Sequence, residues 1–287
     1  MLASRYTSGL IRNFLKANFS TSDSLRKYEN IEKYWNTNAE WYQKHQAQCS
    51  SDIYKSMIPF LHLDTAKNVL EVGAGNGVGA EIMLNHAGPD TKFTLVDFSE
   101  KLIDLAKAKN LPRCDIMHVN SDQLPFPGEK FDRYVSLATL EELENPTSVV
   151  REAYRLIAPK GGILGISVLG RRSSSTYTMI FEKVRHQFGI ENQIKLRREL
   201  SNPGTLKRML KTAGFNRVIT FYEQYHFPTT DVDQLKNIFL EEPGIQAVIK
   251  AGGKAEVEQA VIEELNSVIQ VEETALNYEA LLVMAYK

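Results

Sequence analysis

The feature that most constrains this chain is an apolar strand that leads directly into three glycines at every second position. The strand covers residues 67–72, and Gly73, Gly75 and Gly77 follow it before a helix begins near Val78. Glycine lets a chain turn sharply and lets a ligand approach the backbone, so the pattern predicts a nucleotide-like cofactor site after a buried parallel strand. The dinucleotide fingerprint needs its third glycine where Val78 stands, and this spacing therefore disfavours an NAD site.

A second strand is expected over residues 91–97, and it ends in an acid, Asp97. A carboxylate at this place can accept both hydroxyls of a ribose, and Phe98 beside it offers an apolar face for adenine. The alternative is structural. Ser99 is a suitable N-cap for a helix over residues 100–109, and Asp97 would then only close the turn.

Strands and helices continue to alternate along the chain. Further strands are expected from Cys114, over residues 131–137 and over 163–169, with a helix near 146–156. Such alternation predicts a doubly wound α/β fold with a parallel sheet and right-handed crossovers. Ligands of these sheets bind outside the carboxyl ends of the strands, which is where the glycines and Asp97 would meet.

The order of these segments resembles the class I S-adenosylmethionine-dependent methyltransferases, and within them the methyltransferase type 11 group, similar to the methyltransferases of ubiquinone and menaquinone biosynthesis. The likeness covers roughly residues 30–287 and rests on the glycine motif from Glu71 to Gly77, on Asp97, and on segments 121–125, 131–132 and 156–162. It implies a Rossmann-like methyltransferase fold: a seven-stranded, mostly parallel sheet with an antiparallel last strand, plus a helical lid. The methyltransferase domain would span residues 28–287, with lid elements at 28–60, 171–200 and 228–272.

The resemblance also implies that S-adenosylmethionine is the cofactor and that ten residues bind it. Glu71, Gly73, Ala74 and Gly75 would line its methionine end, Asp97 and Phe98 would hold ribose and adenine, Asp122 and Gln123 would read the adenine edge, and Leu137 and Ala138 would lie near the sulfonium. Methyl transfer is an in-line displacement that requires positioning and exclusion of water, so a general base is optional. No residue is therefore assigned as catalytic. The six histidines have no spacing typical of a metal site, and no metal is expected.

Three side chains are candidate substrate contacts. Many relatives carry a histidine within residues 138–143, where this chain has the adjacent acids Glu141 and Glu142. Either acid could remove a proton from a phenol or an acidic carbon, whereas the pattern favours a solvated pair at a helix N-terminus. An aromatic helix over residues 34–45 contains Tyr42, which matches a tyrosine that folds over the cofactor in related methyltransferases. Alternatively, its aromatic residues only dock the helix on the sheet.

The N-terminus has the composition of a targeting segment. The first 22 residues carry Arg5, Arg12 and Lys16, several hydroxyls and no acid. This resembles a mitochondrial transit peptide, so residues 1–27 are expected to be a presequence and the mature protein to lie in the mitochondrial matrix. An ordinary flexible terminus on a cytoplasmic protein is the alternative. The longest apolar run, residues 161–170, is far shorter than the about 20 residues of a membrane span.

Charge limits the choice of partners. The net charge of −1 gives no indication of nucleic acid binding. Between positions 171 and 198, seven Lys or Arg residues stand against only Glu182 and Glu191. An acidic or phosphorylated acceptor would suit such a segment, although a solvated face is the simpler reading. The leading hypothesis is a methyltransferase acting on a small molecule. The alternative is a noncatalytic or assembly protein of the same fold, bound to a mitochondrial complex.

Overall fold

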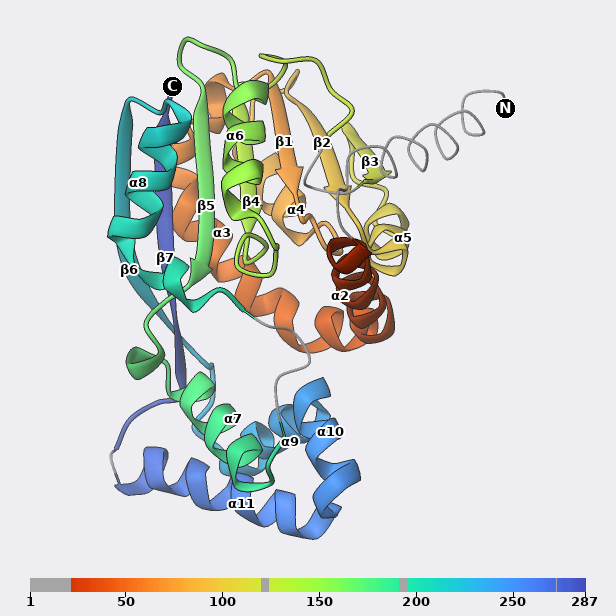
Figure 1. Ribbon diagram of the computed structural model, residues 1–287, viewed down its shortest axis with the longest axis vertical. Coiled ribbons are helices and arrows are strands. Elements are labelled where there is room, and N and C mark those ends of the chain that lie inside the picture. Colours follow the sequence, from red (N-terminus) through yellow and green to blue (C-terminus); the bar gives the residue numbers. More distant parts are fainter. Residues whose placement is uncertain (1–21, 120–123, 191–195, 272) are drawn as a thin grey trace.

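The centre of the molecule is one sheet of seven strands in the order β3-β2-β1-β4-β5-β7-β6 (Figure 1). The structure is a computed structural model that describes residues 22–119, 124–190, 196–271 and 273–287. β7 runs antiparallel to both of its neighbours, and the other strands share one direction, which confirms the predicted doubly wound fold. The strands are β1 (Asn68–Val72), β2 (Lys92–Asp97), β3 (Cys114–His118), β4 (Arg133–Leu137), β5 (Ile163–Leu169), β6 (Arg217–His226) and β7 (Asn277–Tyr286).

Helices cover both faces of this sheet. On one face α6 (Pro146–Leu156) and α8 (Pro203–Ala213) bury their apolar sides, and on the other α3 (Ala47–Leu61) and α4 (Val78–Leu84) do so. α5 (Glu100–Ala108) flanks β2 and β3. Asn145 and Asn202 cap α6 and α8, and a proline follows each cap at the first helical position, where its missing N–H costs nothing.

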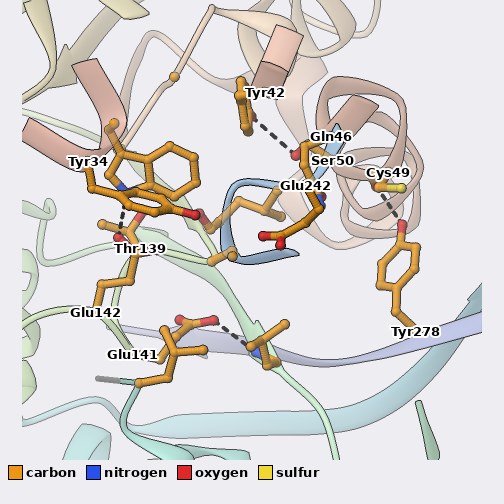
Figure 2. A pocket seen from close by; sticks show the side chains of 18 of the residues that line it. Tyr34, Tyr42, Gln46, Cys49, Ser50, Thr139, Glu141, Glu142, Glu242 and Tyr278 are labelled. Carbon is orange, nitrogen blue, oxygen red and sulfur yellow. Dashed lines mark hydrogen bonds between the residues drawn. The ribbon is translucent and has the colours of Figure 1, made fainter. Parts of the chain in front are cut away.

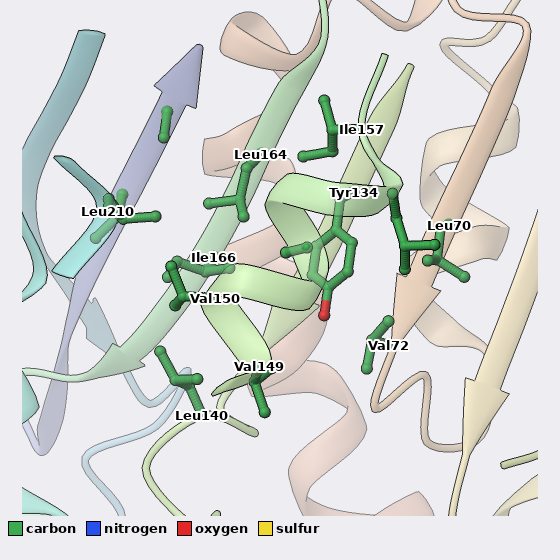
Figure 3. Close-up of a cluster of buried hydrophobic side chains, with 14 of the residues drawn as sticks. Leu70, Val72, Tyr134, Leu140, Val149, Val150, Ile157, Leu164, Ile166 and Leu210 are labelled. Atoms are coloured by element: carbon green, nitrogen blue, oxygen red, sulfur yellow. The ribbon is translucent and has the colours of Figure 1, made fainter. Parts of the chain in front are cut away.

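The central strands are apolar on both faces because both faces are covered. Along β1, Leu70 and Val72 point into the cluster beneath α6, while Val69 points into the cluster beneath α3. Figure 3 shows the first of these clusters, in which Tyr134 of β4 lies among aliphatic side chains of α6 and β5. Tyr134 is 1% exposed, so the sheet centre is closed to water and the ligand site must lie at the strand ends.

The N-terminal helices lead from the sheet to the site. α2 (Ser22–Trp41) continues through a π-helical turn, η1 (Tyr42–Gln46), into α3. Segment 28–60 was expected to belong to the lid. α3 instead places Tyr54, Met57 and Leu61 in the core beside the sheet, so only the first part of this segment lies over the site.

A second group of helices lies beyond the carboxyl ends of the parallel strands (Figure 1). Its members share an apolar cluster of their own, built from α7 (Thr176–Gln187), α9 (Val232–Glu241), α10 (Pro243–Gly252), α11 (Lys254–Asn266) and the π-helical turn η5 (Ser267–Val271). We call these elements the lid. Short 3-10 turns complete the described structure at η2 (Leu63–Thr65), η3 (Arg172–Ser174) and η4 (Arg198–Ser201). Within the described ranges, no helix has the length and apolar character to cross a membrane.

Candidate cofactor and acceptor site

The glycine turn is tied to the end of the neighbouring strand. The backbone N–H groups of Gly73 and Ala74 donate to the carbonyl of Val96, at 2.9 and 3.1 Å. The Gly75 N–H donates to Asp97 Oδ2 and the Ser99 N–H to Asp97 Oδ1, both at 2.9 Å. One buried carboxylate therefore joins the turns that follow β1 and β2, and it fixes the shape of the crevice between them.

Two of the glycines stand where a side chain would not fit. Gly73 has φ 71° and Gly75 has φ 56°, in the left-handed region that L residues avoid. A Cβ on Gly73 would lie 2.0 Å from the hydroxyl of Thr139, and one on Gly75 would lie 3.1 Å from the hydroxyl of Tyr42. The ring of Tyr42 thus lies directly against the turn. Its hydroxyl is within hydrogen-bond distance of Ser50 Oγ, at 3.2 Å.

A cavity of about 300 Å³ extends from this turn to the lid. Nine of the thirteen residues predicted for the cofactor and substrate line it: Gly73, Gly75, Asp97, Phe98, Leu137, Ala138, Tyr42, Glu141 and Glu142. Glu71 and Ala74 are buried outside the cavity lining, and Asp122 and Gln123 lie outside the described residues. The sequence reasoning on Ser99 is confirmed as well, since its side chain caps α5, and Asp97 serves both the turn and the cavity.

Glu71, which the resemblance places at the methionine end of the cofactor, is held by a residue of α3. The hydroxyl of Tyr54, on α3, donates to Glu71 Oε1 at 2.5 Å, and its other carboxylate oxygen has no hydrogen-bond partner among the described residues. Burial raises the pKa of Glu71 to about 7, and the Tyr54 hydrogen bond opposes this rise. Glu71 thus lies against α3 and outside the cavity lining, and its contact with the cofactor stays a prediction.

The prediction that Glu141 and Glu142 form a solvated pair at a helix N-terminus is wrong. Glu141 is 3% exposed, and its Oε1 accepts the backbone N–H of Leu169 at 3.0 Å. Glu142 accepts the indole N–H of Trp35 at 2.8 Å. The helix that follows, α6, has Asn145 as its cap, so neither acid lies at a helix N-terminus. The physical reason is that α2 covers this turn and excludes water from it.

Burial changes the acidity of these groups. It raises the pKa of Glu141 to about 7 and that of Glu142 to about 8, while the hydrogen bonds from Leu169 and Trp35 act in the opposite direction. Burial also raises the pKa of Asp97, against the N–H groups of Ser99 and Gly75. Glu141 and Glu142, with pKa values of about 7 and 8, can exchange protons near neutral pH.

The far end of the cavity consists of residues that the sequence reasoning did not select. Tyr34 comes from α2, Tyr177 and Arg185 from α7, and Glu242 precedes α10 (Figure 2 shows Tyr34 and Glu242). Glu242 caps α10 by accepting the N–H of Ile245 at 2.8 Å, and burial raises its pKa to about 7. Only Glu242 carried a signal in the sequence, because an acid before Pro-Gly is typical of a helix start.

These residues fit S-adenosylmethionine. The two glycines leave the backbone open to a ligand, and Phe98 and the Asp97 carboxylate lie at the end of β2 on the same cavity. Asp97 is 5% exposed and holds the acceptor oxygens that ribose hydroxyls require. Leu137 ends β4 and Ala138 follows it, and both line the same cavity as Glu141 and Glu142. The cavity also reaches the turn after β4, and the strand order reverses between β1 and β4, where ligands of such sheets typically bind.

Comparison with known proteins agrees with this geometry. Residues 70–165 match the family model described as a methyltransferase domain. A Mycolicibacterium smegmatis protein named as an S-adenosylmethionine-dependent methyltransferase is 28% identical over 175 residues, which are 61% of this chain and 59% of that protein. A demethylmenaquinone methyltransferase of Listeria welshimeri is 30% identical over 112 residues, which are 37% of this chain and 47% of the relative. The match thus spans about half the length of these two relatives.

A solved structure shows the same fold. Phosphoethanolamine N-methyltransferase 2 of Haemonchus contortus, in complex with phosphomonomethylethanolamine and S-adenosylhomocysteine, aligns with a TM-score of 0.58 at 16% identity. The alignment covers 91% of this chain and 60% of that chain. At this level of identity the similarity concerns the arrangement of strands and helices.

Proposed function

We propose that this chain, whose residues 70–165 belong to the class I S-adenosylmethionine-dependent methyltransferases, transfers a methyl group to a small-molecule acceptor. The observation that carries the proposal is the continuous cavity. One end is the glycine turn with Asp97, and the other end lies under the lid among Tyr34, Tyr177 and Glu242. A donor at the first end and an acceptor at the second would meet next to Leu137 and Ala138.

When bound, S-adenosylmethionine supplies an electrophilic methyl group on a positively charged sulfur. The chain contributes position and a dry surrounding. Gly73, Gly75 and Asp97 would hold the donor, and the aromatic rings of α2 and the lid would keep water out. Ala138 has φ 50°, an unfavourable conformation for alanine, and its N–H donates to the carbonyl of Ser167 at 3.0 Å. This bond holds the turn after β4 against the reaction zone.

A thermal-shift titration of the full chain tests the proposal. S-adenosylmethionine and S-adenosylhomocysteine are expected to raise the unfolding midpoint by several degrees, since a ligand at 100 times its dissociation constant adds about 2.7 kcal/mol of stability. NADH is expected to cause no shift. Asp97→Asn should lose most of the response, because the amide removes an acceptor oxygen and the charge. A full response in Asp97→Asn, or none in the wild-type chain, would contradict the proposed site.

We also propose that the protein acts in the mitochondrial matrix, on the strength of the basic, acid-free segment before Asp23. Residues 1–27 fused to a fluorescent protein are expected to direct it to mitochondria. A matched fusion in which Arg5, Arg12 and Lys16 are replaced by glutamine should remain in the cytosol. Mitochondrial import of both fusions, or of neither, would overturn the assignment.

A further inference from the structure

We propose that the methyl acceptor is a small organic cation, an amine whose nitrogen lies among the carboxylate of Glu142, the carboxylate of Glu242 and the aromatic rings around them. The inference rests on the proposed methyl transfer and names its substrate class. The acids of the cavity wall come from segments that are far apart in sequence. Glu141, Glu142 and Glu242 line the same cavity (Figure 2).

Acids outnumber bases on this wall. Four carboxylates line the cavity, from Asp97, Glu141, Glu142 and Glu242, against the guanidinium groups of Arg185 and Arg198. Asp97 and Glu242 are engaged by backbone N–H groups, and Glu141 Oε2 is buried with no hydrogen-bond partner among the described residues. A buried carboxylate that lacks partners is costly, and a bound cation would remove that cost.

The two arginines act on acids other than Glu142: the charge of Arg185 opposes the raised pKa of Glu242, and that of Arg198 opposes the raised pKa of Glu141. Arg185 donates to the carbonyl of Ile190 at 2.8 Å, and its guanidinium lies 5.2 Å from the centre of the Phe181 ring. Arg198 donates to Glu182 at 2.9 Å. Glu142 receives only the neutral indole N–H of Trp35 at its carboxylate among the described contacts. Glu142 therefore has no cationic partner in the described part of the chain.

Aromatic rings surround the same space. Tyr34 and Trp35 of α2 pack edge to face at 5.3 Å, and Trp35 packs in the same way on Tyr42 at 5.8 Å. On the lid side Tyr177 stacks on Phe227 at 5.4 Å. All five residues line the cavity. Ring faces together with carboxylates form the usual environment for an ammonium group, because both attract positive charge.

The basic segment at residues 171–198 does not provide free positive charge that could bind an acidic acceptor. Five of its described basic residues are paired with acids within the protein: Arg171 with Glu279, Arg172 and Arg198 with Glu182, Lys183 with Glu264, and Arg197 with Glu199. The phosphorylated or acidic acceptor considered from the sequence would meet a wall of carboxylates instead. Burying such a pair of like charges is unfavourable.

The chemistry of an amine acceptor gives Glu142 a defined task. A protonated amine has no free electron pair, so it must lose one proton before it can attack. Glu142 in its ionised form can take that proton and become neutral, and its pKa of about 8 puts this exchange near neutral pH. The nitrogen then forms a bond to the methyl carbon, the carbon–sulfur bond breaks, and the sulfur keeps its electron pair. The products are a methylated ammonium and neutral S-adenosylhomocysteine.

The test compares a cation with its neutral isostere. Choline and 3,3-dimethylbutan-1-ol differ only by nitrogen in place of carbon, and each is titrated calorimetrically into the full chain saturated with S-adenosylhomocysteine. This complex lacks the sulfonium charge, so the measurement reports the acceptor end alone. Choline is expected to bind at least tenfold more tightly than the alcohol. Glu142→Gln should reduce this preference at least tenfold, and Glu263→Gln, an exposed acid on α11, should leave it unchanged.

The outcomes separate the two proposals. If S-adenosylhomocysteine binds but choline shows no preference over the alcohol, or binds no better than the detection limit, the amine assignment is overturned and methyl transfer to another acceptor stands. If S-adenosylhomocysteine itself fails to bind, the proposed function fails first. A preference that survives Glu142→Gln would also overturn the assignment. Circular dichroism of each variant confirms that the fold is retained before affinities are compared.

Discussion

Single residues in this molecule carry different amounts of information about the site. Asp97 ends β2 and lies where its sequence position predicted, on the cavity and against the Gly75 N–H. Glu71 begins the glycine motif but lies outside the cavity lining, in contact with Tyr54. The difference follows from the alternation along β1, which directs Leu70 and Val72 to one face and Glu71 to the other.

The role of Gly75 predicts the effect of adding one methyl group. Gly75→Ala should lose about 1–2 kcal/mol of unfolding free energy, because alanine is disfavoured at φ 56°. It should also bind S-adenosylhomocysteine at least tenfold more weakly, because its Cβ would displace Tyr42. Gly161→Ala is the matched control, with φ 74° and no atom within 4 Å of the new Cβ. Equal loss of binding in both variants would contradict a specific role for Gly75.

Glu71 predicts a pH dependence of stability. Its pKa is raised from 4.5 to about 7 in the folded chain, so the folded state binds the proton more tightly than the unfolded state. The stability that the protonated group provides is complete below about pH 4.5 and is lost as pH rises through about 7. Glu71→Gln removes this loss. The free energy of unfolding of the variant, taken relative to that of wild type, should therefore rise by up to about 3 kcal/mol from pH 5 to pH 8.

Urea unfolding of both chains at the two pH values checks this prediction. Glu141, Glu142 and Glu242 have raised pKa values as well, but they are present in both chains and cancel in the comparison. A difference between the chains that does not change with pH would show that Glu71 titrates as it does in the unfolded state.

At the scale of elements, α2 decides what the acids after β4 become. The hydrogen bond from Trp35 to Glu142 joins residues 107 positions apart. Because of this contact, the turn after β4, which the sequence predicts to be solvated, forms part of the cavity wall. η1 is held at the same time from the lid, because Glu241 of α9 pairs with Lys44 and His45 at 2.5 and 2.7 Å. Such exposed pairs contribute little stability, so α2 depends mainly on its buried contacts.

The two tryptophans of α2 permit a matched test of that hydrogen bond. Trp35→Phe removes the donor to Glu142, whereas Trp41→Phe removes an indole N–H that has no partner among the described residues. At pH 9, where Glu142 is ionised, Trp35→Phe should cost about 2 kcal/mol more than Trp41→Phe. Chemical denaturation at this pH measures both losses. Equal losses would mean that the bond does not contribute to the docking of α2.

The elements also show where sequence reasoning succeeds. Strands, crossover helices and the cap at Ser99 could be predicted because each depends on neighbours in the chain. The cavity wall could not, since the burial of Glu142 depends on Trp35 and the far end joins α2 with α7 and α10. The position of α3 was missed for the same reason. The apolar side of α3 could pack on a lid or on a sheet, and the sequence alone does not distinguish the two.

On the scale of the whole molecule, the protein has two kinds of core. The clusters on the two faces of the sheet extend through every central strand, while the lid cluster is confined to α7, α9, α10, α11 and nearby loops. The cavity lies between them and is lined by both. A ligand that fills it would therefore connect two units whose stabilities are set by different contacts.

Hydrogen exchange of the full chain should reveal this division. Amides of β1, β4 and β5 are expected to exchange slowest, and those of α7, α10 and α11 faster, because fewer apolar layers cover the lid helices. Addition of S-adenosylhomocysteine should slow exchange in residues 34–46 and in the glycine turn. Uniform exchange rates across sheet and lid, with or without the ligand, would contradict a division into two cores.

The way in which the lid joins the sheet has a consequence for how such a protein diversifies. Most of the lid is inserted between β6 and β7, and the N–H of Phe227 donates to the carbonyl of Leu276 at 2.9 Å where the insertion leaves and re-enters the sheet. Because its two ends are neighbours, the insertion can be lengthened, shortened or exchanged without changing the strand register. Under the proposed function, the part of the acceptor wall that this insertion supplies can thus change while the glycine turn and Asp97 keep their places at the sheet.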